Sequence, residues 1–182
     1  MIVNHGVELP ELLRTDSCLS AGNMLKMKEY AMLEYHSTTE EEKRLISDWK
    51  YEGEYAIYNT LPYEDQVKTH RGFANPRNNY YSFCDDGKLI GYVNFVNTDK
   101  EVRFGIGVVP KCCNRGYGQM ICKMAIKLSD QLYPGKMLCL EVRTWNTRAV
   151  RCYEKAGFHI IGDPVRKTTP IGEGEFFRMT TK

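Results

Sequence analysis

The sequence predicts a mixed α/β fold, in which a central sheet of strands is flanked by helices. Between residues 80 and 109, three apolar runs are separated by turn residues, which is typical of antiparallel strands. After residue 118, apolar residues recur at helical spacing, and strand and helix patterns then alternate. The length of 182 residues fits one domain of about 100 to 200 residues. We assign this domain to residues 27–182 and treat residues 1–26, where no period holds, as an N-terminal extension.

The first part of the domain predicts one strand and two helices. Residues 27–36 partly alternate between apolar and polar side chains, as a strand does. Three hydroxyl residues and three glutamates then form a capping-box pattern, which starts a helix with Leu45, Ile46 and Trp49 on one face. Further along we expect turns over residues 51–63 and a short helix over 63–71.

Residues 80–109 predict a meander of three antiparallel strands. The runs 80–84 and 89–96 flank an Asp-Gly turn at 85–88, and this dipeptide favours the positive φ of a tight hairpin. A second turn at 97–100 leads into the third strand, over residues 102–109.

The remainder predicts helices and strands in alternation. A helix begins at Gly116 and Gly118 and ends before the Pro-Gly pair at 134–135. A buried strand covers 137–142, and Asn146 is a suitable N-cap for a second helix that ends at Gly157. A short strand at 160–161, a Gly/Pro-containing loop and a terminal strand over 176–180 complete the prediction.

Composition excludes several classes of function. The formal net charge of +2 gives no basic field for nucleic acid, and no window approaches the roughly 20 apolar residues of a membrane span. Seven cysteines are too few for a disulfide scaffold and suit a reducing cytoplasm. No Cys-x-x-Cys pair occurs and the four histidines are scattered, so we expect no metal.

The segment 108–118 carries the first chemical pattern. It joins a strand end to a turn and to two glycines that open a helix, where free amides and a partial positive charge of about +0.5 attract anions. Residues 113–118 therefore form a candidate anion cradle, with Arg115 as added charge. The alternative is that the glycines serve close packing. No P-loop lysine follows, and position 121 is Ile instead of the third glycine of a dinucleotide fingerprint.

The second pattern is Leu-Glu-Val-Arg-Thr-Trp-Asn at 140–146, followed by Arg-Ala-Val-Arg-Cys-Tyr-Glu-Lys-Ala-Gly-Phe at 148–158. Together with the cradle it resembles the GNAT superfamily of N-acetyltransferases, and within it the ribosomal-protein alanine and the aminoglycoside 6′-N-acetyltransferases. The resemblance implies the acyl-CoA N-acyltransferase fold, with a central mixed sheet flanked by helices, over the domain. Cys113 departs from the Gln or Arg usual at its position, so only the backbone is expected to hold phosphate there.

The resemblance also implies roles for individual residues. Tyr153 stands at the general-acid position and Glu141 at that of a candidate base. The cofactor-binding set is Val108, Val109, Cys113, Asn114, Arg115, Gly116, Tyr117, Gly118 and Asn146. Alternatives stay open: Tyr153 as a core residue, Asn146 as a helix cap only, and Glu141 as the partner of Arg143 in a salt bridge. Glu101 is a weaker candidate base.

The function that follows is direct transfer of acetyl from acetyl-CoA to a primary amine of a small molecule or a peptide N-terminus. Aromatic and acidic residues of the N-terminal half are candidates for a cation-friendly acceptor pocket; they are Tyr51, Glu52, Glu54, Tyr55 and Tyr58. The partners are acetyl-CoA and the amine, without nucleic acid, membrane or metal, and a homodimer stays open. The rival interpretations are a catalytically silent CoA-binding regulatory module and a scaffold without ligand.

Overall fold

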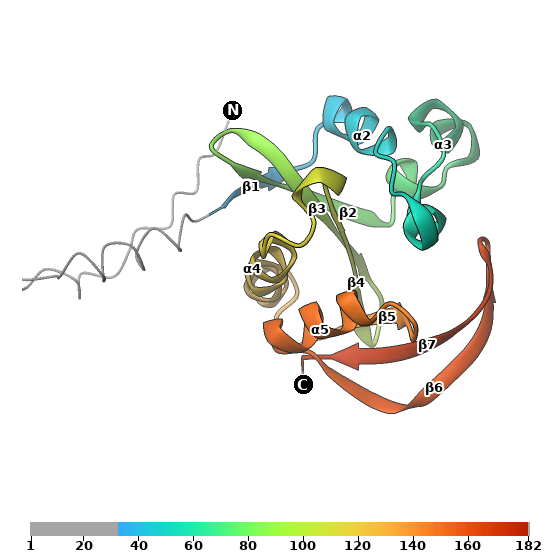
Figure 1. The fold of residues 1–182 in the computed structure, drawn as a ribbon. Helices are drawn as coiled ribbons and strands as arrows, with labels where there is room; N and C mark the ends of the chain where they lie inside the picture. The colour runs from blue at the N-terminus through green and yellow to red at the C-terminus, as the bar shows by residue number, and fades with distance from the viewer. Residues whose placement is uncertain (1–32, 182) are drawn as a thin grey trace, which may run out of the picture. The chain divides into compact units, whose positions relative to one another are not determined.

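In a computed structural model, residues 33–181 are described, and they form a seven-stranded sheet of order β1-β2-β3-β4-β5-β7-β6 (Figure 1). Neighbouring strands are antiparallel except β4 and β5, which are parallel. This confirms the predicted mixed sheet. The strands are β1 (Glu34–Ser37), β2 (Asn78–Asp85), β3 (Lys88–Asn97), β4 (Glu101–Val108), β5 (Met137–Arg143), β6 (His159–Thr169) and β7 (Gly172–Thr180).

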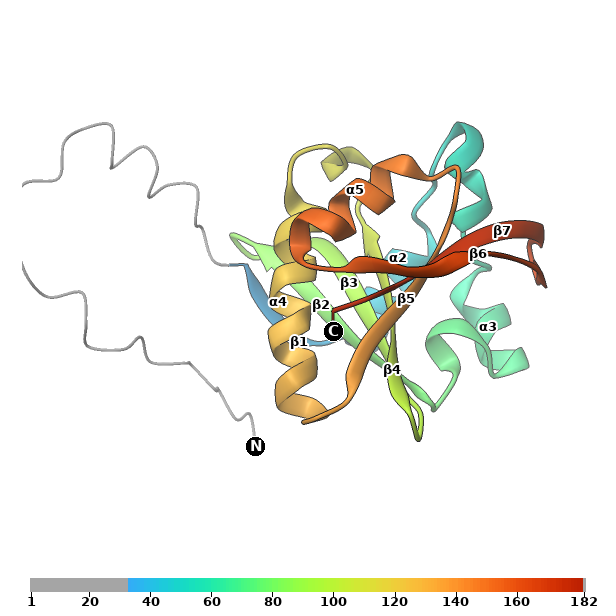
Figure 2. The same ribbon diagram turned by 90° about the horizontal axis from the view of Figure 1, so that it is seen from below.

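Among residues 33–181, four α-helices and three 3₁₀ turns accompany the sheet. They are α2 (Glu40–Ser47), α3 (Tyr63–Thr69), α4 (Tyr117–Leu132), α5 (Thr147–Ala156), η2 (Gly53–Tyr58), η3 (Gly72–Ala74) and η4 (Pro110–Cys112). Figures 1 and 2 show α4 and α5 on one side of the strands and α2 and α3 on the other. Among residues 33–181, no helix combines the length and apolar character needed to span a bilayer.

Along β2 and β3, successive side chains point to opposite faces of the sheet and enter two separate hydrophobic clusters. Phe83, Val93 and Phe95 are fully buried with the apolar faces of α4 and α5. On the opposite face, Tyr80 and Tyr92 pack against a smaller cluster from α2, α3 and η3; its buried members are Ile46, Tyr63 and Phe73. Because successive strand residues point to opposite faces, one sheet holds helices on both sides.

The strands β4 and β5 separate soon after they begin. Their parallel pairing covers only three positions, of which the last joins Arg103 to Cys139. The N–H of Val109 donates to the Ile90 carbonyl at 2.8 Å, so the ladder alternation turns the backbone polar groups of Ile106 and Val108 away from β3. These groups face the space that β5 has left, which makes this edge of β4 available to a ligand.

The first helix confirms its capping box and corrects one side chain. The Thr39 hydroxyl accepts from the Glu42 N–H at 3.2 Å, and the Glu42 carboxylate accepts from the Thr39 N–H at 2.9 Å. Ile46 is buried as predicted, but Leu45 is 58% exposed. Adjacent residues of a helix point about 100° apart around its axis, so Ile46 faces the core while Leu45 faces away from it. The N-terminal extension and the first part of the predicted strand, up to residue 32, lie outside the described residues.

The last hairpin was predicted too short. β6 continues to Thr169 and pairs with β7 along a ribbon, with a register irregularity between Ile161 and Val165 where a loop was expected. Most β6 side chains beyond this point are exposed, so no alternating apolar face reveals the strand. The backbone ladder with β7 holds the ribbon, and sequence pattern does not record such pairing.

Candidate active site

A cavity of about 610 Å³ opens where β4 and β5 diverge. The predicted residues that line it are Val108, Cys113, Asn114, Gly116, Gly118, Glu141, Asn146 and Tyr153. The tertiary structure thus brings both chemical segments of the sequence to one cavity. Val109, Arg115 and Tyr117 are outside its lining. The Tyr117 hydroxyl donates instead to Asp85 at 2.6 Å, while Arg115 is exposed.

Among the described residues, the backbone N–H groups at the start of α4 have no hydrogen-bond acceptor. Within the described part of the chain, no hydrogen bond is made by the N–H groups of residues 114–118. Gly116 precedes the helix at φ 87°, a left-handed conformation that glycine adopts without strain. At Gly118 a Cβ would lie 3.2 Å from the Cys152 sulfur. The close approach of α4 to α5 at Gly118 confirms the packing use of one glycine, and the anion cradle at Gly116 stays a prediction.

Three cations that the sequence prediction missed lie along the same wall. Arg148, Arg151 and Lys155 all come from α5 and line the cavity. Their spacing of three and then four residues places them on one helix face, and this spacing was visible in the sequence. Cys113 meets the Val108 and Val109 carbonyls only at 3.8 Å. The positive charge of the cavity therefore comes from these three residues of α5, from Arg143 of β5 and from the helix start.

Tyr153 presents a phenol to the cavity from the middle of α5. Its ring packs edge-on against Phe158, with centroids 6.0 Å apart. Its hydroxyl has no hydrogen bond to any residue that the structure describes, although it lines the cavity. Burial raises the pKa of Tyr153 well above its ordinary value, and the neighbouring thiols of Cys122 and Cys152 act in the same direction. The phenol thus stays protonated at neutral pH, as a proton donor must.

Asn146 joins the helix cap to the N-terminal half of the domain. Its side-chain oxygen accepts from the Ala149 N–H at 3.2 Å, which confirms the predicted N-cap. Its amide nitrogen donates to the Tyr58 hydroxyl at 3.0 Å. Both polar atoms of this buried side chain are therefore engaged while it lines the cavity.

Glu141 and Arg143 do not form the salt bridge that the sequence left open. The Glu141 side chain is 52% exposed and pairs with Lys167 of β6. Arg143 is 6% exposed, donates to the Glu173 carbonyl at 3.0 Å and lies over the Phe176 ring. The Arg143 Nε is buried without a partner, and no carboxylate pairs with this guanidinium among residues 33–181.

Glu101 is separate from the cavity. It pairs with Arg178 and Arg103 at the end of β4 where the strands still hold together. The catalytic-base prediction therefore rests on Glu141.

The tyrosines of the N-terminal half reach the cavity in part. Tyr51 donates to the Val108 carbonyl at 2.9 Å, and both Tyr51 and Tyr58 belong to the lining. The face of Tyr55 is covered by Arg148, whose guanidinium carbon lies 3.9 Å from the ring centroid. The predicted cation-friendly surface at Tyr55 is therefore filled by the chain's own arginine. Glu52 and Glu54 are exposed and lie outside the lining.

Comparison with known proteins gives concordant matches. The model of the acetyltransferase (GNAT) family matches residues 31–158. The N-alpha-acetyltransferase RimI of Mycobacterium tuberculosis is 30% identical over 97 residues, which are 50% of this chain and 59% of that relative's length.

Solved structures share the fold. A spermidine N-acetyltransferase from Vibrio cholerae, with CoA and spermine, has a TM-score of 0.63 at 20% identity, over 81% of this chain and 94% of that one. The ribosomal-protein-S18-alanine N-acetyltransferase of Escherichia coli has a TM-score of 0.59 at 20% identity, over 82% and 92%. AAC(6')-Ib with ribostamycin and coenzyme A has a TM-score of 0.63 at 18% identity, over 80% and 92%.

Proposed function

We propose that this chain, which belongs to the GNAT family of acetyltransferases, transfers acetyl directly from acetyl-CoA to a primary amine. One observation carries the proposal: Asn114, Gly116 and Gly118, whose amides are free among the described residues, line the same cavity as Tyr153, whose hydroxyl has no hydrogen bond to a described residue. An anion-binding helix start and a protonated acid are the two features that a CoA-dependent acyl transfer needs.

Coenzyme A fits this cavity in a defined direction. Its diphosphate would accept hydrogen bonds from the amides of residues 114–118, with Arg148, Arg151 and Lys155 adding charge along α5. Its pantetheine arm would follow the open edge of β4, where the backbone groups of Ile106 and Val108 face away from β3. Tyr51 already donates to the Val108 carbonyl, so the Val108 N–H remains for the ligand. This path brings the thioester toward Tyr153.

The reaction then needs two proton transfers. The amine nitrogen attacks the thioester carbon, a C–N bond forms and the C–S bond breaks. Tyr153 donates its proton to the leaving thiolate, and Glu141 accepts the proton of the amine through water. The exposure of Glu141 to solvent supports the water-mediated route.

An acyl-enzyme route is the alternative that the cavity allows, because Cys152 also lines it. The hydrogen bond with Cys122 lowers the pKa of the Cys152 thiol against the opposing effect of burial, and Arg148 and Lys155 help. We expect Cys152→Ala to retain turnover, and intact-mass measurements with acetyl-CoA alone to show no acetylated protein. An acetyl adduct that Cys152→Ala abolishes, together with turnover, would replace direct transfer by the two-step route.

The charged residues near the place where the amine acceptor would bind favour some classes of amine over others. Among the described residues, Arg143 is buried without a carboxylate partner, and Glu141 pairs with Lys167. A second positive charge on the acceptor is therefore disfavoured, whereas a neighbouring carbonyl or carboxylate suits Arg143. This favours peptide N-termini and amino-acid-like small amines over polyamines and aminoglycosides.

A turnover screen tests the proposal. Thiol release from acetyl-CoA is measured with amino acids, short peptides, polyamines and aminoglycosides, and peptides with blocked N-termini serve as matched controls. We expect turnover by free N-termini or amino acids. CoA binding with no turnover on any amine would instead establish a silent CoA-binding module.

The six described cysteines are free thiols, which supports the proposal that the enzyme works in the cytoplasm.

A further inference from the structure

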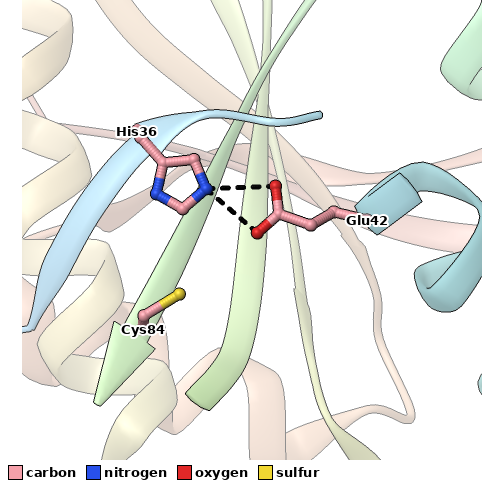
Figure 3. A group of neighbouring side chains, drawn as sticks. All are labelled: His36, Glu42 and Cys84. Atoms are coloured by element: carbon pink, nitrogen blue, oxygen red, sulfur yellow. Dashed lines mark hydrogen bonds and ion pairs between the residues drawn. The ribbon is translucent and has the colours of Figure 1, made fainter. Parts of the chain in front are cut away.

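A second cluster of reactive side chains lies outside the cavity. His36 of β1, Glu42 of α2 and Cys84 of β2 point toward one another (Figure 3). One ligand atom from each side chain lies within 4.8 Å of the others. None of the three lines the cavity described above. We propose that this His36–Glu42–Cys84 cluster is a zinc site that fastens the first strand and helix to the sheet.

The donor set selects the metal. One imidazole nitrogen, one carboxylate oxygen and one thiolate sulfur are the three ligand types that zinc uses, whereas calcium and magnesium take oxygen alone. Tetrahedral zinc with bonds of about 2.0 to 2.3 Å keeps its ligand atoms roughly 3.3 to 3.7 Å apart. His36 Nε2 and Glu42 Oε1 are 3.0 Å apart, and the limit of 4.8 Å leaves about 1 Å for the sulfur to close. Water completes the fourth position.

The Glu42 carboxylate is oriented for this role. Its Oε2 accepts from the Thr39 N–H at 2.9 Å and from the Ser82 hydroxyl at 2.9 Å. Its Oε1 has His36 as its contact among the described residues. His36 Nε2 also lies 3.1 Å from Oε2, so Thr39 and Ser82 hold that oxygen while Oε1 meets only His36 among the described residues. Hydrogen bonds that hold one carboxylate oxygen are the outer-shell support that metal-binding carboxylates receive.

Burial and access also suit a metal. Cys84 is 8% exposed and its sulfur has no hydrogen-bond partner in the described part of the chain. The His36 side chain is 46% exposed, which leaves an entry path from solvent. On binding, the thiol proton leaves and a sulfur–zinc bond forms. The thiolate and the Glu42 carboxylate then supply two negative charges, which match the two positive charges of zinc.

Such a site would stabilise the edge of the sheet. β1 is four residues long and all of its side chains are exposed, so little apolar burial holds it. A metal bound by β1, α2 and β2 adds to the contacts that already join these elements, which are the β1–β2 pairing, the His36–Glu42 ion pair and the Ser82–Glu42 hydrogen bond. Because metal binding to a folded site adds to folding stability, the effect is measurable without any assay of acetyl transfer.

The experiment titrates Zn²⁺ into the full chain after chelation and reduction. We expect one equivalent to bind, with a Tm increase of about 5 to 10 °C at roughly 100 times the Kd. Co²⁺ in place of Zn²⁺ reports the ligands through a thiolate charge-transfer band and the absorption of a tetrahedral ion. His36→Ala and Cys84→Ser should each abolish the Tm increase and the cobalt spectrum, while circular dichroism checks that both variants fold.

Three control variants address the other histidines and thiols. His159→Ala removes an exposed histidine, Cys139→Ser removes a buried thiol, and Cys112→Ser breaks the adjacent Cys112–Cys113 pair. All three should keep the zinc effect. If zinc does not bind the wild-type chain, or if its binding survives both cluster variants, the proposal is wrong and His36 and Glu42 form only an ion pair. Neither result bears on the proposed acetyl transfer, because none of the three cluster residues lines the cavity.

Discussion

Tyr153 is the residue whose surroundings define the chemistry most sharply. Its phenol is partly buried among apolar side chains and thiols, the residue lines the cavity, and the hydroxyl has no hydrogen bond to a described residue. A core tyrosine normally finds a partner for its hydroxyl, so a hydroxyl that faces a cavity without one is available to a ligand. Its neighbours thus favour the catalytic over the structural interpretation.

We predict that Tyr153→Phe lowers kcat by about 100-fold or more, because general acid catalysis contributes roughly 10² to 10⁴. The KM for acetyl-CoA and the Tm should change little, since the hydroxyl bonds nothing in the protein. Burial keeps the pKa of Tyr153 above its ordinary value, so the wild-type rate should not fall through loss of this proton below about pH 10.

Tyr133→Phe is the matched control, because Tyr133 packs against the same core while its hydroxyl is held by Asn79 at 2.7 Å. It should leave kcat unchanged. Equal rates for Tyr153→Phe and the wild type would remove Tyr153 from the chemistry.

Glu141 is predicted to act as the base, and its partner Lys167 provides the control. Glu141→Gln should lower kcat/KM by at least 10-fold and remove the acidic limb of the pH–rate profile. Lys167→Met breaks the same ion pair and should retain most of the rate. Because both side chains are partly exposed, each variant should lose less than about 1 kcal/mol of stability. Comparable rates in the two variants would indicate that Glu141 is only an ion-pair partner.

The start of α4 shows how one element combines conformation and binding. Gly116 has a positive φ immediately before α4, whereas a Cβ at Gly118 would lie 3.2 Å from the Cys152 sulfur, closer than an ordinary contact. These are separate physical requirements within one short motif. They are therefore separable by mutation.

We predict that Gly116→Ala raises the KM for acetyl-CoA by about 10-fold and costs about 1 to 2 kcal/mol of stability, because alanine disfavours the left-handed region. Gly135→Ala is the control: Gly135 has φ 80° and open space around it, near the other end of α4. It should cost similar stability and leave KM unchanged. If both variants change KM equally, the effect is loss of folding and not loss of the cradle.

At the scale of the whole molecule, the change of Tm on ligand binding tests whether the start of α4 contributes to CoA affinity. CoA should raise Tm by about 5 to 10 °C at roughly 100 times its Kd. Pantetheine lacks the diphosphate that the amides of α4 would hold, so it should give a much smaller increase at the same concentration. The absence of any increase with CoA would favour a scaffold without ligand, and equal increases would place the affinity outside the cradle.

The sequence by itself determined the meander, the helices α4 and α5, and the N-caps of α2 and α5. In these elements local patterns decide: the turn residues at 85–88, the capping box at Thr39 and the Asn146 cap each act within a few residues. The segments 113–118 and 140–158 could be singled out for the same reason, since each pattern is contiguous, and the roles of their residues stay predictions.

Only the tertiary structure decided contacts between distant segments. The Glu141–Lys167 pair, the Arg148–Tyr55 stacking and the approach of Tyr51 to Val108 each join residues far apart in the chain. The His36–Glu42–Cys84 cluster and the long β6–β7 ribbon are of the same kind. Periodicity records which face a residue occupies within its own element, whereas packing and strand register decide which side chain it meets.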